Sequence, residues 1–285
     1  YLYSPLLFAI GSASTLLYSP PATRHSLPPP FPPMSSRKKL IAGNWKMNGN
    51  RVEATRIAAG LARKLTDADR PLPRITLCPS FPYLGLVHDL LENTAIKIGA
   101  QNCSEYLEGS YTGEASAKQI KDIGCAHVIL GHSERRSHFK ETNANIKAKA
   151  AVALKEKLIP IICIGETLAQ KEAGQTITAI LSQLRESLPK DIRAEQFLIA
   201  YEPVWAIGSG STPTCEEIEH VHGAIRQELG KIVSPAGITP ILYGGSVSPA
   251  NAKEIMKIQN VNGVLVGGAS LKLDEFWDII QSSDE

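Results

Sequence analysis

Short apolar runs alternate with longer amphipathic segments from Lys39 to the end of the chain. The apolar runs are continuous rather than alternating in polarity, which is typical of strands that are covered on both faces in a parallel sheet. We expect eight such strands, at residues 40–42, 75–77, 96–98, 128–130, 161–164, 197–200, 241–242 and 264–266.

Helical spacing marks the segments between the apolar runs. Apolar residues recur three or four positions apart and form one stripe on each predicted helix; the stripes are Ile177-Ile180-Leu181-Leu184-Leu188, Ile218-Val221-Ile225-Leu229-Ile232 and Ile146-Ala150-Leu154-Leu158. Capping-box spacing in Thr214-x-x-Glu217 and Thr167-x-x-Gln170 indicates two helix starts. Ser248 followed by Pro249 predicts another N-cap, with proline at the first helical position.

Eight strands, each followed by a helix, predict an α/β protein built from eight βα units. A doubly wound open sheet and a closed barrel both fit this alternation. No Gly-x-Gly-x-x-Gly follows the first strand, which argues against the dinucleotide-binding form of the open sheet. The count of eight favours a single (β/α)8 barrel that occupies residues 37–285.

Composition narrows the classes of function. The 285-residue chain has 30 basic and 28 acidic residues and a formal charge of +2, a balance that argues against a nucleic-acid-binding protein. Its five cysteines are odd in number and include no Cys-x-x-Cys pair. We therefore expect the reduced thiols of a cytosolic protein, without a disulfide framework or a zinc site.

The N-terminal extension, residues 1–36, differs from the rest of the chain. It contains no Asp or Glu and has a proline-rich stretch at 28–33, so we expect it to be disordered. Its apolar stretch, 2–18, is interrupted by Pro5 and is short for a membrane span. Two interpretations stay open: a transit peptide, as the acid-poor composition indicates, or a non-native leader ahead of a natural start at Met34.

Chemically useful side chains follow three of the predicted strands. Lys46 lies after the first strand, His132 after the fourth and Glu202 after the sixth. Active residues of such a barrel lie at the carboxyl ends of the strands, so these three should meet at one mouth. Taken singly, they fit a solvated charge, a histidine satisfied by a local hydrogen bond and a surface ion-pair member. Their common placement favours catalysis.

Glycine-rich loops follow the sixth, seventh and eighth strands, at 206–210, 244–245 and 267–268. Glycines let backbone N–H groups approach a ligand closely, and clusters of such groups bind anions. We therefore expect a phosphate-bearing substrate, although paired glycines are also ordinary turn residues. His220 and His222 do not share a face of their predicted helix, and we interpret both as surface residues rather than metal ligands.

Five motifs together resemble those of the triosephosphate isomerase family. They are GNWKMN (43–48), GHSERR (131–136), AYEPVWAIG (200–208), YGGSV (243–247) and GVLVGGASL (263–271), and the likeness extends over about residues 39–280. The resemblance implies a TIM barrel that interconverts dihydroxyacetone phosphate and D-glyceraldehyde 3-phosphate through an enediolate, without a cofactor or a metal.

The resemblance also implies roles for individual residues. Glu202 would be the catalytic base, His132 the electrophile, and Lys46 and Asn44 would contact the substrate, with Ser133 and Glu134 in support. The phosphate would be held by backbone N–H groups of Gly208, Ser246, Gly267 and Gly268. The closing lid would consist of Pro203, Val204, Trp205, Ala206, Ile207, Gly208, Ser209, Gly210, Ser211, Thr212 and Pro213.

The chemistry explains why such groups are needed. Removing a proton beside a carbonyl requires a base, and desolvation would raise the pKa of Glu202 towards working pH. The oxyanion that develops needs donors, which His132 and Lys46 can supply. His132 begins a predicted short helix, whose positive potential disfavours the imidazolium.

Assembly, compartment and lid kinetics are further expectations from the resemblance. Family members are usually homodimers, in which the loop at 101–116 reaches into the partner and buttresses Asn44 and Lys46. We expect a cytoplasmic protein, or an organellar one if 1–36 is a transit peptide. The lid ends in Ser211-Thr212-Pro213 where relatives usually carry a basic residue, which predicts altered lid kinetics.

Two rival functions fit the same fold. One is another phosphate-binding barrel enzyme, such as an epimerase or an aldolase. The other is a non-catalytic protein that kept the scaffold. The presence of Lys46, His132 and Glu202 argues against the second.

Overall fold

A computed structural model of the chain describes residues 38–207, 212–235 and 238–283. The N-terminal extension that was predicted to be disordered, 1–36, lies outside the described residues. The same holds for four predicted lid residues, Gly208, Ser209, Gly210 and Ser211.

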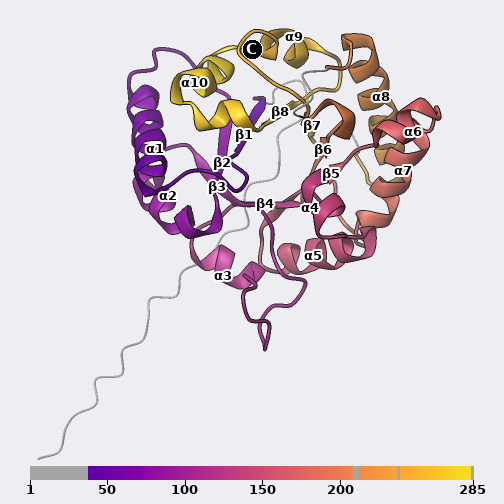
Figure 1. The fold of residues 1–285 in the computed structure, drawn as a ribbon, viewed down its shortest axis with the longest axis horizontal. Coiled ribbons are helices and arrows are strands. Elements are labelled where there is room, and N and C mark those ends of the chain that lie inside the picture. The colour runs from indigo at the N-terminus through magenta and orange to yellow at the C-terminus, as the bar shows by residue number, and fades with distance from the viewer. Residues whose placement is uncertain (1–37, 208–211, 236–237, 284–285) are drawn as a thin grey trace, which may run out of the picture.

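Eight parallel strands of the described chain close into a barrel in sequence order, which confirms the predicted fold. The strands are β1 (Leu40–Asn44), β2 (Arg74–Cys78), β3 (Lys97–Ala100), β4 (His127–Leu130), β5 (Ile159–Ile164), β6 (Leu198–Tyr201), β7 (Ile241–Tyr243) and β8 (Gly263–Val266). Pairing of β1 with β8 closes the ring. Figure 1 views the molecule down the barrel, with the strands at its centre.

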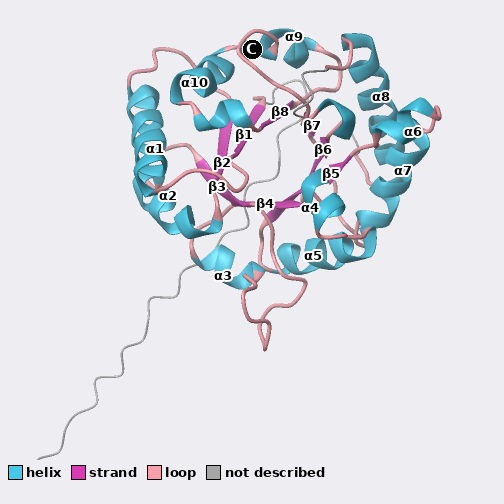
Figure 2. Cartoon of the chain, viewed as in Figure 1, coloured by secondary structure: helices cyan, strands magenta, loops and turns pink. Residues whose placement is uncertain are grey.

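Helices surround the ring of strands, as Figure 2 shows. In the described residues they are α1 (Arg51–Thr66), α2 (Leu84–Leu91), α3 (Ala117–Asp122), α4 (Ser133–His138), α5 (Asn143–Lys155), α6 (Leu168–Glu172), α7 (Thr176–Ser187), α8 (Cys215–Ile232), α9 (Ala252–Lys257) and α10 (Leu273–Gln281). None of them is both long and apolar enough to span a bilayer.

Alternate strand residues face the two sides of the barrel wall. The interior is filled by an apolar cluster of Leu40, Ala42, Cys78, Ile129, Ile161, Cys163, Leu198, Ala200, Leu242 and Leu265. Their sequence neighbours, such as Ile41 and Ile162, pack outward into the layer between strands and helices. Both faces of each strand are therefore covered, which explains why the apolar runs are continuous.

Local capping signals locate two helix starts correctly and one incorrectly. The side chains of Thr214 and Thr167 cap α8 and α6 through the two predicted capping boxes. The predicted N-cap at Ser248 is wrong, because α9 begins only at Ala252. The Ser248 carbonyl instead accepts the N–H groups of Asn251 and Ala252 in a turn that leads into the helix.

His222 is fully buried, so its interpretation as a surface residue is wrong, whereas His220 is exposed. His222 lies four positions after Ile218 and three before Ile225, which places it on the apolar stripe of α8. Its Nδ1 atom is 3.3 Å from the carbonyl oxygen of Asn260. Burial lowers the pKa of this imidazole to about 4.

Candidate active site

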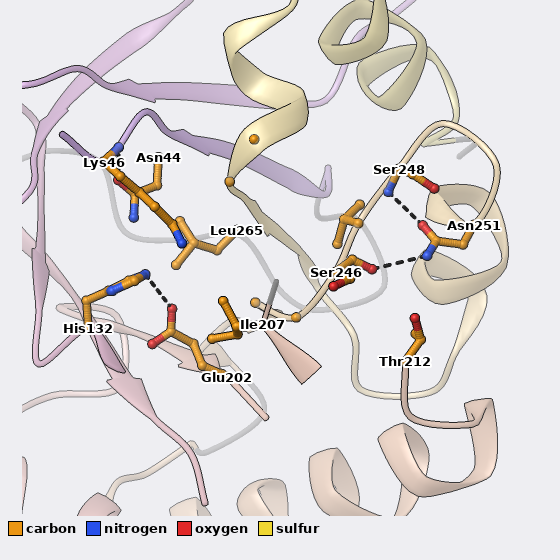
Figure 3. Close-up of a pocket in the computed structure, with 15 residues that line it drawn as sticks. Asn44, Lys46, His132, Glu202, Ile207, Thr212, Ser246, Ser248, Asn251 and Leu265 are labelled. Atoms are coloured by element: carbon orange, nitrogen blue, oxygen red, sulfur yellow. Dashed lines mark hydrogen bonds and ion pairs between the residues drawn. The ribbon is translucent and has the colours of Figure 1, made fainter. Parts of the chain in front are cut away.

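A cavity of about 390 Å³ opens at the carboxyl ends of the strands (Figure 3). Its lining consists of Asn44, Lys46, His132, Glu202, Ile207, Thr212, Gly244, Gly245, Ser246, Val247, Ser248, Asn251, Leu265, Gly267 and Gly268. The predicted catalytic residues therefore meet in one cavity, as do the predicted substrate-binding residues that are described. Gly208 is not among the described residues.

The alternation of strand residues places two of these side chains. Leu198 and Ala200 of β6 face the barrel interior, and Glu202 continues that series just beyond the end of the strand. Asn44 ends β1 in the same way, two positions after Ala42. Both side chains are nearly inaccessible, with Glu202 2% and Asn44 4% exposed. The barrel thus holds a carboxylate and an amide at its inner rim.

Glu202 and His132 point toward each other across the cavity (Figure 3). The Nε2 atom of His132 donates to Oε1 of Glu202 over 3.0 Å. The second carboxylate oxygen, Oε2, accepts the backbone N–H of Ser133 over 2.9 Å. Ser133 therefore supports the site through its amide, and the Glu202 carboxylate is fixed at both oxygens.

The position of His132 as the N-cap of α4 determines its tautomer. Its Nδ1 atom accepts the backbone N–H of Glu134 over 3.3 Å. Because an acceptor nitrogen carries no proton, Nε2 bears the hydrogen that is directed at Glu202. The hydrogen bond at the helix start therefore directs the Nε2–H of His132 toward Glu202 and the cavity. The predicted disfavouring of the imidazolium is opposed here by the neighbouring carboxylates, which raise the pKa of His132.

Opposing influences act on the pKa values of this pair. Burial raises the pKa of Glu202, but His132, the Ser133 amide and Lys46 together hold it below its ordinary value. The rise predicted from desolvation is therefore not found in this arrangement. Burial lowers the pKa of His132, and the carboxylates of Glu202 and Glu134 raise it above its ordinary value. Each shift depends on the direct contact between the two groups.

Lys46 has a backbone conformation that non-glycine residues rarely adopt, with φ of 53°. Its N–H donates to Oδ1 of Asn44 over 3.0 Å, which links the two residues at the strand end. Its Nζ atom lies 2.6 Å from Oε1 of Glu134. Glu134 therefore supports the site in two ways, through its amide to His132 and through its carboxylate to Lys46.

Gln101 and Ser80 hold the Lys46 backbone. Gln101 begins the loop that was expected to buttress Lys46 from a partner subunit, and Ser80 was not singled out from the sequence. The Nε2 atom of Gln101 donates to the Lys46 carbonyl over 2.8 Å and to the Cys78 carbonyl over 2.9 Å. The hydroxyl of Ser80 lies 3.2 Å from the same Lys46 oxygen. The signal that was available for Gln101 was its place just after the third strand, β3.

The far end of the cavity is built from backbone. Gly268 starts a short 3₁₀ helix, Gly268–Leu271, and a Cβ atom at Gly268 would meet no heavy atom within 4 Å. The Gly267 carbonyl accepts both the N–H and the hydroxyl of Ser270. Ser246 is fixed by Asn251, whose amide nitrogen donates to its carbonyl over 3.1 Å. Free backbone space beside a helix start suits an anion.

Glu202 could not take this position without glycine beside it. A Cβ atom at Gly244 would lie 2.9 Å from Cγ of Glu202, and one at Gly165 would lie 1.8 Å from the Glu202 carbonyl oxygen. The second contact is with backbone, which cannot move aside. Glycine is thus required here for close packing around the carboxylate.

The start of the predicted lid is attached to the barrel. The indole Nε1 of Trp205 donates to Oε1 of Glu166 over 2.8 Å. The Ser246 hydroxyl donates to the carbonyl of Ala206 over 2.8 Å. Burial raises the pKa of Glu166 above its ordinary value. The sequence analysis did not single out Glu166, which follows β5 by two residues.

Metal-ligand geometry is not found in the described part of the chain. Among those residues, no three His, Cys, Asp or Glu side chains gather closely enough to hold a metal ion. The cavity is lined by the carboxylate of Glu202, the imidazole of His132, the ammonium of Lys46 and the glycines of two loops. Such a set can move a proton and stabilise an oxyanion.

Comparison with known proteins gives the same family throughout. The sequence profile described as triosephosphate isomerase matches residues 39–283. The triosephosphate isomerase of Rhodopirellula baltica is 47% identical over 254 residues, covering 87% of this chain and 98% of the relative. That of Rhizobium meliloti is 43% identical over 249 residues, with coverage of 87% and 97%.

A solved structure agrees with the sequence comparisons. The crystal structure of triosephosphate isomerase from Bartonella henselae superposes with a TM-score of 0.79 at 37% identity, covering 86% of this chain and 98% of that one. Near-complete coverage by a profile, by relatives and by a structure leaves one assignment: the chain belongs to the triosephosphate isomerase family.

Proposed function

We propose that the protein interconverts dihydroxyacetone phosphate and D-glyceraldehyde 3-phosphate, with Glu202 as the base that carries the proton. One observation carries this proposal. A buried carboxylate, an imidazole 3.0 Å away and the Lys46 ammonium line the same 390 Å³ cavity. Family membership supplies the substrate, since the relatives are triosephosphate isomerases.

The reaction begins when the substrate replaces the contact between Glu202 and His132. The Glu202 carboxylate gives up its hydrogen bond with the Nε2–H of His132 and abstracts the carbon-bound proton from C1 of dihydroxyacetone phosphate. Abstraction leaves an enediolate, whose oxygen accepts hydrogen bonds from His132 and Lys46. Return of the proton from Glu202 to C2 gives the aldehyde, and transfer between the two oxygens completes the balance of protons.

When Glu202 moves away from His132, the pKa values of both groups change. The carboxylate loses the imidazole that holds its pKa down, so burial becomes the dominant influence and raises the pKa toward that of a useful base. The imidazole loses the carboxylate that raises its pKa. Burial and the Glu134 amide then favour the neutral form, which can donate and recover one proton.

The phosphate end of the substrate fits the opposite side of the cavity. By the family pattern, backbone N–H groups of Gly208, Ser246, Gly267 and Gly268 would hold the phosphate, and the last three of these residues line the cavity. A lid from Pro203 to Pro213 would exclude water from the enediolate and so suppress loss of phosphate. Support comes from the lining, in which Ile207 and Thr212, on either side of residues 208–211, both reach the cavity.

A coupled assay with D-glyceraldehyde 3-phosphate, run with and without a chelator, tests the function. The proposal predicts turnover that the chelator does not change. Turnover that the chelator abolishes would instead indicate a metal-dependent epimerase or aldolase of the same fold. Absence of turnover in folded protein would indicate a non-catalytic scaffold.

A homodimer is proposed through the segment between β3 and α3, 101–116, which projects away from the barrel (Figure 1). Tyr106 and Tyr111 stack in this segment with ring centroids 4.0 Å apart, and both remain exposed. Met47 is 94% exposed and Phe139 68% exposed. Apolar side chains with such exposure are typical of a surface that another subunit covers.

Sedimentation equilibrium of the intact chain tests this assembly. The expected mass is twice that of the chain, and Met47→Glu should shift it toward one chain by placing a charge in the contact. A wild-type mass of one chain at all concentrations would contradict the dimer. The cytoplasm is the proposed compartment, and cell fractionation with an antibody to the barrel tests it.

A further inference from the structure

Lys171 contacts Trp205, in the first part of the predicted lid, and Glu217, on the helix that follows the lid. It lies on α6, outside the cavity, and its Nζ atom is 3.3 Å from the ring centroid of Trp205. The same atom is 3.1 Å from Oε1 of Glu217 on α8. One ammonium group therefore joins a residue that precedes the lid's central residues to the helix that follows them.

The contact with Trp205 places a charge over an indole face. A cation at this distance is attracted by the negative face of the ring. The indole is also fixed at its edge, where Nε1 donates to Oε1 of Glu166. Glu166 is 1% exposed and follows β5, so Trp205 is held between a buried carboxylate and the Lys171 ammonium.

The contact with Glu217 links Lys171 to the start of α8, which follows the predicted lid. Glu217 is the third residue of α8, and its Oε2 atom accepts the N–H of Thr214 over 2.9 Å. Its Oε1 atom is the one that faces Lys171. Thr214 directly follows Pro213, where the predicted lid ends. The carboxylate thus transmits the position of Lys171 to the backbone at the far hinge.

We infer that Lys171 is a positioning residue for the isomerase reaction, which acts by holding Trp205 and Thr214 at a fixed spacing. The inference rests on the proposed function. Two residues between these flanks, Ile207 and Thr212, line the cavity. Holding Trp205 and Thr214 in place therefore holds Ile207 and Thr212 in position against the phosphate end of the substrate. Lys171 itself does not line the cavity and makes no contact with the reacting atoms.

Three matched variants separate charge, shape and the link to α8. Lys171→Met keeps a long apolar stem and removes the charge, whereas Lys171→Arg keeps a cation that can lie over the indole and pair with Glu217. Glu217→Gln preserves the capping box, because glutamine caps equally well, and weakens only the ion pair. The Lys171 side chain is 32% exposed, so substitution leaves the core intact.

Steady-state kinetics with D-glyceraldehyde 3-phosphate give the main readout. Lys171→Met should raise KM about fivefold and change kcat by less than twofold, because a loosened flank weakens ground state and transition state alike. Lys171→Arg should restore KM to within twofold of wild type. Turnover of D-glyceraldehyde, which lacks the phosphate, should be the same in all variants. A fold defect would instead lower kcat for both substrates.

The double variant Lys171→Met/Glu217→Gln tests whether Lys171 acts through its ion pair with Glu217. Coupled groups give non-additive effects, so its KM should match that of Lys171→Met alone. Fluorine NMR with 5-fluorotryptophan gives a readout that needs no activity. The Trp205 resonance, assigned with Trp205→Phe, should shift in Lys171→Met and return in Lys171→Arg.

The outcomes are distinguishable. An unchanged KM and an unmoved Trp205 resonance in Lys171→Met would overturn the inference, as would equal impairment of the Met and Arg variants. Wild-type protein without isomerase turnover would refute the proposed function instead, and the resonance would still report whether the cation positions Trp205.

Discussion

Gln101 is predicted to control catalysis through the backbone of Lys46. In Gln101→Ala, the Lys46 carbonyl loses its 2.8 Å hydrogen bond and the Cys78 carbonyl loses one of 2.9 Å. What remains at the Lys46 carbonyl is the Ser80 hydroxyl, whose single proton also faces the Asn48 carbonyl at 3.0 Å. The strained conformation of Lys46, with φ of 53°, is then poorly held.

The magnitude follows from the contacts that are removed. Two hydrogen bonds contribute about 1–3 kcal/mol together, and a left-handed residue stores about 1–2 kcal/mol that favours relaxation. Relaxation moves the Lys46 ammonium away from the oxyanion position. A loss of about 1.4 kcal/mol in transition-state stabilisation is about tenfold in rate. We therefore expect kcat/KM to fall on the order of tenfold in Gln101→Ala.

The assay is kcat/KM for D-glyceraldehyde 3-phosphate, accompanied by urea unfolding to confirm that each variant is folded during the assay. Gln101→Glu is the matched variant, since it keeps the shape but turns an oxygen toward two carbonyls and should be worse than alanine. Ser80→Ala, which removes only the longer contact, should be milder. A folded Gln101→Ala with kcat/KM within twofold of wild type would refute this account of Lys46.

Three further predictions concern the base, the lid and a buried histidine. Glu202→Asp withdraws the carboxylate by roughly 1 Å and should lower kcat on the order of 10²-fold; near-wild-type turnover would remove Glu202 from the role of base. Pro213→Ala should change kcat or KM by relaxing the lid hinge, and unchanged values of both would show that Pro213 does not affect the lid. His222 has a pKa of about 4 in the fold against 6.5 for the free group. Because the unfolded chain binds this proton more tightly, the free energy of unfolding falls as the pH falls from 6.5 to 4, by about 3 kcal/mol in total. Urea unfolding of His222→Asn across this range should show a flatter pH dependence than wild type, and an equal slope would contradict the assignment.

The main candidate site residues could be brought together from the sequence because a parallel barrel brings all strand ends to one mouth. Glu202 and Asn44 could be placed by alternation alone, since each continues an inward series of its strand. His132 could be placed by its position at a helix start. These inferences need only the order and the period of the elements.

Hydrogen bonds between residues that lie far apart in the chain could not be predicted from the sequence. Gln101 matters because its amide meets carbonyls of residues 23 and 55 positions away, and Glu166 matters because an indole 39 positions later reaches it. His222 was assigned to the surface because its polarity was weighed without its position between Ile218 and Ile225. The start of α9 was missed because Ser248 opens a turn rather than the helix.

Deuterium exchange tests the role of Glu202 most directly. In D2O, wild-type protein should convert dihydroxyacetone phosphate to D-glyceraldehyde 3-phosphate that carries deuterium at C2, and should exchange a hydron at C1 of the remaining substrate, both detected by proton NMR. Glu202→Gln retains the acceptor that meets the Ser133 amide but lacks a basic oxygen. Its exchange should be slower by about 10²–10⁴-fold. Exchange at the wild-type rate in this variant would contradict a proton shuttle built on Glu202 and His132.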